Sequence, residues 1–138
     1  MTTVRVDAWQ FQCCGGRFGV GDTVTWGLVP EHSSHLGTRI GSRRAQEVAW
    51  SESHHGPADA LRQRGRIAAL EAVWVAFAQQ GSGGSLEPVP GTAVTRAIKR
   101  ADVWAEPQGN LRYLGWLAEL DALPAGYRVS AGRSGRAP

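Results

Sequence analysis

The chain has 138 residues, enough for one domain with its own hydrophobic core but too few for two ordinary domains. A hydrophobic content of 42% and a charged content of 20% exclude a disordered chain. The net charge of +3 comes from three arginines near the C-terminus, because the other 12 bases equal the 12 acids in number, and a neutral body argues against nucleic acid as a partner. No apolar run approaches the roughly 20 residues of a membrane-spanning helix, and residues 1–5 lack the apolar core of a signal peptide, so we expect a cytoplasmic protein.

The first predicted element lies in residues 3–11, which are rich in β-forming side chains. Val4 and Val6 alternate on one face, whereas Trp9 and Phe11 fall on the other, so the apolar face changes along the segment. This pattern predicts a strand with a bulge, or a strand that is buried on both faces.

Residues 22–28 show the clearest alternation, with Val24, Trp26 and Leu28 on one face and polar or small residues on the other. A half-buried strand is predicted there. Shorter alternations predict two further strands. Their apolar faces consist of Val48 and Trp50 in residues 45–51, and of Leu114, Trp116, Ala118 and Leu120 in residues 112–120.

Two other segments, residues 65–79 and 92–106, are compatible with both helix and strand. The first is rich in Ala, which favours helix, but it also contains Val73 and Val75, which favour strand. The second has apolar residues at helical spacing. An α+β fold with helices near residues 59–79 and 92–106 is therefore the alternative to a mostly β fold.

The end of the chain has almost no apolar side chain to bury. Residues 128–138 contain Arg128, Arg133 and Arg136 among small residues, without any acid. We expect one domain over residues 1–127, followed by a flexible basic tail over residues 128–138.

A dense motif lies at residues 7–26. It consists of an acidic residue followed by Trp9-Gln10, Cys13-Cys14-Gly15, Phe18, Val20-Gly21-Asp22 and Trp26. The pattern resembles the opening of a family of small actinobacterial proteins of unknown function. Further matches to that family are His54-His55-Gly56, Pro88-Val89-Pro90-Gly91 and residues 113–117, whereas residues 31–44 depart from it. The resemblance implies a compact, mostly β protein from an actinobacterial cytosol, and it implies no activity.

The resemblance favours strand over helix for both ambiguous segments. Five to seven strands in a chain of this length predict a small curled barrel or a sandwich, because a flat open sheet would leave its edges unpaired. The six Trp residues can fill the core of such a barrel or line a ligand cavity, and core packing is the expected use.

All cysteines and histidines lie between residues 13 and 55. The candidate zinc ligands are Cys13, Cys14, His54 and His55, with His32 and His35 as further candidates. Zn²⁺ prefers thiolate and imidazole ligands in tetrahedral geometry. Adjacent residues of a strand point to opposite faces, so convergence of both thiols requires the turn that Gly15 and Gly16 permit.

The same residues allow three other interpretations. Either cysteine is a candidate thiol nucleophile, with His54 or His55 as its base and a carboxylate to orient the imidazole. The carboxylates considered for that role are Glu52, Asp59 and Asp7. A Cys13–Cys14 disulfide would be strained, because neighbouring Cα atoms lie only about 3.8 Å apart, and a reducing cytosol opposes it. Finally, the cysteines can be ordinary core residues and the histidines part of a polar turn.

We therefore expect a small binding or accessory module whose site combines the Cys13-Cys14 turn with the His54-His55 segment. Zinc is the candidate cofactor, and a small molecule or another protein is the expected partner. The alternative is a small enzyme, either a metal-assisted hydrolase or a thiol catalyst, that uses the same residues. A nucleic-acid-binding β-barrel is a second alternative, which the neutral body disfavours.

Overall fold

The computed structural model describes residues 1–8, 17–31, 36, 40–53, 61–79, 84–101 and 109–123. Strands dominate this part of the chain. In chain order its elements are β1 (Thr2–Asp7), β2 (Thr23–Pro30), α3 (Ser42–Glu47), β3 (Val48–Glu52), β4 (Leu61–Gln79), β5 (Leu86–Pro88), β6 (Val94–Ala97) and β7 (Leu111–Ala122). The predicted tail over residues 128–138 lies outside the described residues, as do Trp9 and Phe11.

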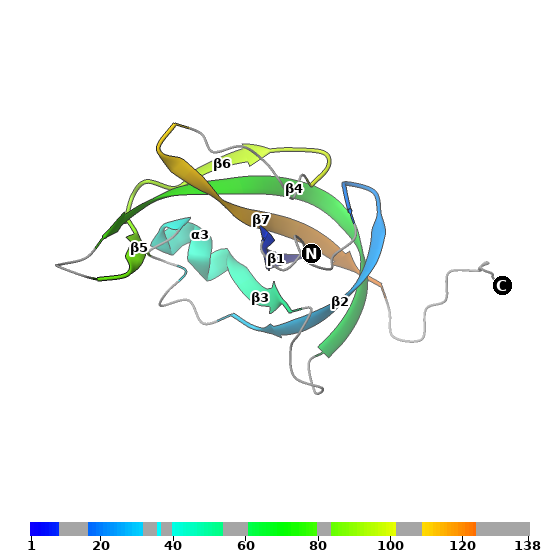
Figure 1. Ribbon diagram of the computed structural model, residues 1–138. Coiled ribbons are helices and arrows are strands. Elements are labelled where there is room, and N and C mark those ends of the chain that lie inside the picture. Colours follow the sequence, from blue (N-terminus) through cyan, green and yellow to red (C-terminus); the bar gives the residue numbers. More distant parts are fainter. Residues whose placement is uncertain are drawn as a thin grey trace.

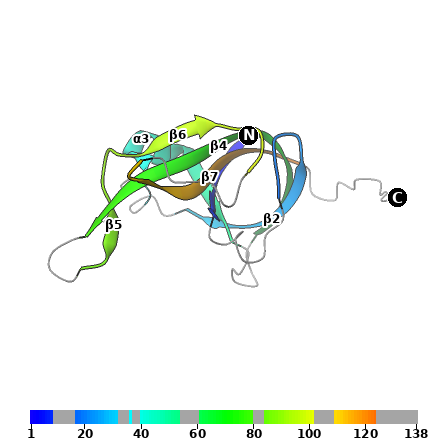
Figure 2. The ribbon, with the colours of Figure 1, turned by 45° about the horizontal axis from the view of Figure 1, so that its top comes forward.

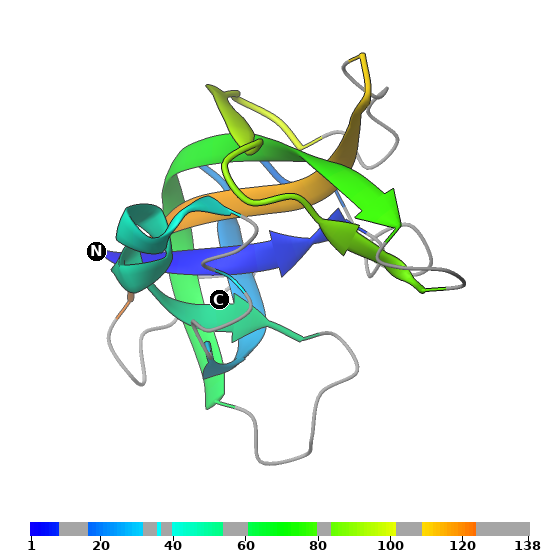
Figure 3. The same ribbon diagram turned by 90° about the vertical axis from the view of Figure 1, so that its left-hand side faces the viewer.

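Five of the strands close into a barrel. β1 pairs with β3 in parallel, and the rest of the ring is antiparallel, from β3 to β2, β4, β7 and back to β1. Figure 1 shows β4 and β7 curving over the barrel, and Figure 3 shows β1 lying between β7 and β3. Outside the ring, β5 and β6 pair with the second half of β4, which projects from the barrel in Figure 2. The predicted mostly β fold, a small curled barrel, is confirmed.

The long strand β4 organises the barrel, because its 19 residues pair with β2, β7, β5 and β6. The alternative of a helix near residues 59–79 is therefore wrong over residues 61–79. Ala-rich sequence favours helix locally, but pairing on both edges of β4 and burial of its Val, Ile and Trp side chains outweigh that preference. The helix near residues 92–106 is also wrong where the chain is described, since residues 94–97 form β6.

The helix α3 was not expected. Residues 45–51 were predicted as one strand, but the strand begins only at Val48, and residues 42–47 form α3. An ion pair between Arg44 and Glu47, three residues apart, supports this single turn and a half of helix. Within the described residues no helix is long and apolar enough to cross a bilayer.

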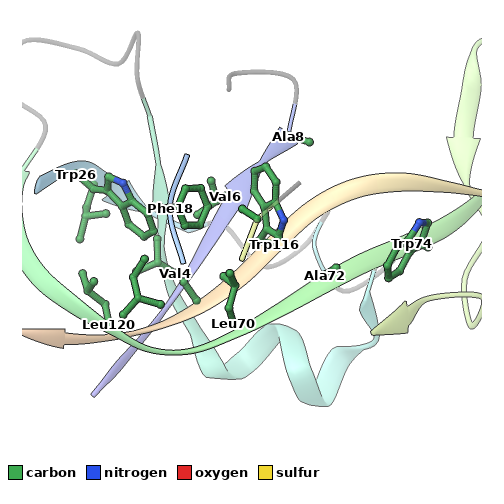
Figure 4. Packing of buried hydrophobic residues seen from close by; sticks show 14 residues of the cluster. Val4, Val6, Ala8, Phe18, Trp26, Leu70, Ala72, Trp74, Trp116 and Leu120 are labelled. Carbon is green, nitrogen blue, oxygen red and sulfur yellow. The ribbon is translucent and has the colours of Figure 1, made fainter. Parts of the chain in front are cut away.

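The interior of the barrel is an aromatic core. Phe18 lies between Trp26 and Trp116, with edge-to-face contacts and ring centroids 5.4 and 5.1 Å apart (Figure 4). The predicted inward face of β2 is confirmed, because Trp26 and Leu28 are buried in this core and Val24 packs against it. The buried members of this interior core are Val4, Val6, Ala8, Phe18, Trp26, Leu28, Ile67, Leu70, Ala72, Trp74, Ala101, Trp116, Ala118 and Leu120.

A second, outer core lies between the barrel wall and the segment that contains α3. Its buried members are Leu36, Ala45, Val48, Val73, Val75 and Leu117. Leu114 packs here, not beside Trp116 as its spacing predicted. The reason is an irregularity in the β4–β7 pairing that skips Leu114 and moves the inward face by one residue. Gly115 permits it, because its φ is 151° and a side chain there would collide with the Val6 carbonyl.

Candidate functional site

The predicted site residues all fall on segments that the structure leaves undescribed. These residues are Cys13, Cys14, His32, His35, His54 and His55. The zinc, nucleophile and disulfide hypotheses therefore stay predictions. Within the described residues, no group of three or more His, Cys, Asp or Glu side chains is arranged to hold a metal ion.

The strands that lead into these segments are described, and they meet at one end of the barrel. β1 and β3 are parallel neighbours, with Val4 opposite Trp50 and Arg5 opposite Ser51. Their C-terminal ends therefore lie side by side, about 5 Å apart. The chain continues from Ala8 toward Cys13 and Cys14, and from Ser53 directly into His54.

Arg5 connects the end of β1 to the residue that precedes His32. Its guanidinium donates to Asp7 and Glu31 at 2.5 Å each, and the Arg5 side chain is only 19% exposed. Burial lowers the pKa of Arg5, but the charges of Asp7 and Glu31 and the hydrogen bonds to them outweigh burial and raise it. Arg5 is thus a permanently charged link between β1 and the end of β2.

A very small cavity adjoins this ion cluster. Arg5, Asp7, Leu36, Ile40 and Leu114 are among the residues that line its volume of about 10 Å³, which is too small for a ligand. Leu36, the residue after His35, is 2% exposed and belongs to the outer core. The residues on both sides of the segment 32–35 are therefore fixed near the end of β1.

Asp7 and Glu52, two of the carboxylates proposed to orient an imidazole, are described, and their surroundings differ. Asp7 is committed to Arg5. Glu52 is the last residue of β3, opposite Leu28, and it is 3% exposed. A carboxylate is rarely so buried in the absence of a specific interaction. Glu52 is thus the buried acid that stands closest in sequence to His54 and His55. Asp59 lies outside the described residues.

The described Trp residues serve the core. Trp26, Trp74 and Trp116 are buried, and Trp50 packs against the same interior core. A depression of about 310 Å³ is open to solvent, and no Trp lines it. It is lined by Val20, Ala68, Ala69, Leu70, Ala97, Ile98 and Lys99. The expectation of core packing is confirmed for these four residues, and Trp104 lies outside the described ranges.

The ion clusters of Arg5 and Arg44 were not predicted from the sequence. Arg44 on α3 contacts Glu47, Glu71 and Glu119, so it ties the helix to β4 and β7. Burial lowers the pKa of Arg44, but hydrogen bonds to Glu47 and Glu71 outweigh the effect of burial and raise the pKa. Two spacings were local signals: Arg5 and Asp7, two residues apart on one face of a strand, and Arg44 and Glu47, three residues apart in a helix. The partners Glu31, Glu71 and Glu119 are distant in sequence.

Comparison with known proteins identifies the family. The chain matches a family of unknown function, DUF6578, over residues 1–122. The protein belongs to this family. No curated protein and no solved structure matches the chain.

Proposed function

We propose that the protein is a small binding module with a zinc site at the end of the barrel where β1 and β3 finish. The observation that carries the proposal is the parallel pairing of β1 and β3, which brings Ala8 and Ser53 to the same end. The proposed ligands come from the two segments that follow, namely Cys13, Cys14, His54 and His55.

Chain geometry supports this arrangement. His54 is bonded directly to Ser53, and Cys13 is five residues beyond Ala8, a span of about 17 Å when fully extended. Because Ala8 and Ser53 follow adjacent strands, both segments are long enough to reach a common point. A pair of segments from opposite ends of the barrel would not have this freedom.

His32 and His35 are the reserve ligands. Glu31 is tied to Arg5 and Leu36 lines the same small cavity as Asp7, so the segment between them starts and finishes near the end of β1. Four ligands suffice for tetrahedral zinc, and six candidates are available. We propose Cys13, Cys14, His54 and His55 as the four, with His32 and His35 in reserve.

Glu52 supports an imidazole ligand in this proposal. A metal-bound histidine donates its second ring nitrogen to a carboxylate or carbonyl, which fixes its tautomer and orientation. Glu52 is buried and precedes His54 by two residues, so we assign it that role.

The enzyme alternative also draws on Glu52. A buried carboxylate beside a histidine is the arrangement that orients a general base for a thiol or a metal-bound water. In that case Glu52→Gln would abolish turnover while zinc remains bound.

Zinc content of the purified protein tests the proposal. We expect about one zinc ion per chain, with loss of metal in Cys13→Ser, Cys14→Ser, His54→Gln and His55→Gln. Removal of zinc with a chelator should lower the melting temperature, because a ligand that binds only the folded state stabilises it. Val75→Ala is the matched control, since it weakens the outer core without removing a candidate ligand.

The outcomes separate the alternatives. Full zinc in Val75→Ala and none in the ligand variants supports the site. Zinc-free wild-type protein that cannot be loaded with added Zn²⁺ contradicts it. Loss of metal in Val75→Ala as well would mean that general instability, and not ligand removal, explains the variants.

A further inference from the structure

The charges on the described surface are segregated, although the body of the chain is neutral. On and around the outer core, two arginines form ion pairs with five carboxylates. Arg5 pairs with Asp7 and Glu31, and Arg44 pairs with Glu47, Glu71 and Glu119. Even with Arg43 of α3 counted as a third base, the acids outnumber the bases on this side of the barrel. Other bases are gathered on a different part of the described surface.

The first part of β4 carries three of them in a row. Arg62, Arg64 and Arg66 occupy alternate positions of the strand, so their side chains leave the same face of the sheet. Arg62 and Arg66 are exposed, and Arg64 is half-buried. Neither Arg62 nor Arg66 forms an ion pair with a described residue. The row is about 14 Å long, at roughly 3.4 Å per residue.

The neighbouring strands complete this face. In the β2–β4 pairing Thr25 lies opposite Arg64 and Thr23 opposite Arg66, and both threonines are exposed. On the other edge of β4, Asp121 lies opposite Arg66, and among the described residues it is the one carboxylate in register with the row. The exposed guanidinium groups of Arg62 and Arg66 and the two hydroxyls make this surface rich in donors. Three arginines against one carboxylate in register give it a net positive charge.

The last described residue of the chain, Leu123, lies beside the row. Its backbone N–H donates to the carbonyl of Arg64 at 2.9 Å. In the sequence it is followed by Arg128, Arg133 and Arg136, which lie outside the described residues.

From this surface we infer a binding site for the phosphate backbone of a nucleic acid, formed by Arg62, Arg64 and Arg66 with Thr23 and Thr25. A linear row of guanidinium groups is complementary in shape and charge to a linear polyanion. Guanidinium N–H groups and hydroxyl groups both donate hydrogen bonds to phosphate oxygens. The aromatic side chains of the interior core are buried and none lies in the row, so bases are not stacked here. Binding is therefore independent of the nucleotide sequence. It is also independent of the proposed zinc site.

Fluorescence anisotropy with a labelled oligodeoxythymidine of about 15 nucleotides tests the inference on the full chain. The test variant is Arg62→Gln with Arg66→Gln. The control with the same change of charge is Arg43→Gln with Arg112→Gln, both exposed, on α3 and at the start of β7. Figure 1 shows these elements away from the first residues of β4. Thermal melting of both variants verifies that each is folded.

We expect the test variant to bind about tenfold more weakly at moderate salt and the control to change less than about twofold. Loss of two phosphate contacts should also reduce the slope of log affinity against log salt by about 1.4 for a single strand. A duplex of the same length distinguishes single-stranded from double-stranded partners through the same phosphate chemistry.

Three results would overturn the inference. Equal weakening in the test and control variants would show that general charge, not this row, attracts the oligonucleotide. Tighter binding of a polyglutamate peptide than of either nucleic acid would assign the surface to an acidic protein instead. Absence of binding by the wild-type protein at low salt would also reject it.

Discussion

The two hydrophobic cores of the protein differ in composition and in how they are enclosed. The interior core is aromatic and surrounded by a closed ring of strands. The outer core is aliphatic, and the described segment that covers it contains only the six-residue helix α3 and the residues Leu36 and Ile40. The barrel therefore depends mainly on the interior core, whereas the outer core fixes the segment that follows β2 and carries His32 and His35. Local opening is expected at the outer core first.

The largest expected effect compares two leucines of β7. Leu120 faces the interior core and Leu117 the outer core, and they are 1% and 2% exposed. We expect Leu120→Ala to lower the free energy of unfolding by about 4 kcal/mol, and Leu117→Ala by about 2.5 kcal/mol, because the outer core can relax around the cavity. Denaturant unfolding measures both. Equal losses would remove the distinction between the cores.

A smaller effect separates the two ion clusters. Arg5→Gln leaves Asp7 and Glu31 without their shared partner in a largely buried position, and we expect a loss of about 2 kcal/mol. Arg44→Gln acts on a more exposed cluster, and we expect about 0.5 kcal/mol. Unfolding curves at neutral pH compare the two variants, and a larger effect for Arg44 would contradict the account.

The pH dependence of the Arg5 contribution has a definite sign. Its pKa is raised in the folded protein, so the stabilisation is fully present below the unfolded value and is lost only as the pH rises through the folded value. The difference between wild type and Arg5→Gln should therefore stay constant from neutral to moderately alkaline pH. A difference that shrinks between pH values of about 7 and 9 would show that another group titrates in the cluster.

The smallest effect concerns the C-terminal residues. Because residues 130–138 offer almost nothing apolar to bury, we expect their removal to leave the melting temperature nearly unchanged. Differential scanning calorimetry measures the shift. A decrease above about 5 °C would correspond to roughly 1 kcal/mol and would show that the segment packs on the barrel.

The sequence predicted the fold class and most strands because the alternation of apolar and polar residues along a strand indicates which side chains are buried. Residues 22–28 have uninterrupted alternation, and the observed inward face is the predicted one. The prediction failed where the pairing skips a residue. In β4 the inward residues are Ile67, then Leu70 and Ala72, since the pairing with β7 is irregular after Ile67. Such a shift depends on the neighbouring strand, and no local pattern encodes it.

The candidate site was less predictable for a different reason. Composition and spacing identify Cys13, Cys14, His54 and His55 as residues with ligand chemistry, but bringing them together depends on which strands are neighbours. The parallel pairing of β1 with β3 joins segments about 45 residues apart, and hydrophobic patterns do not specify strand order. The arginine row was overlooked for a related reason, since net charge averages over both sides of the barrel.

The most direct test of the account is the pairing of β1 with β3 in solution. Nuclear Overhauser effects between backbone protons of Val4 and Trp50, and of Arg5 and Ser51, report this pairing in isotope-labelled protein. We predict cross-peaks for both pairs in the pattern of parallel strands about 4.8 Å apart. Their absence, or an antiparallel pattern, would separate Ala8 from Ser53 and contradict the proposed zinc site.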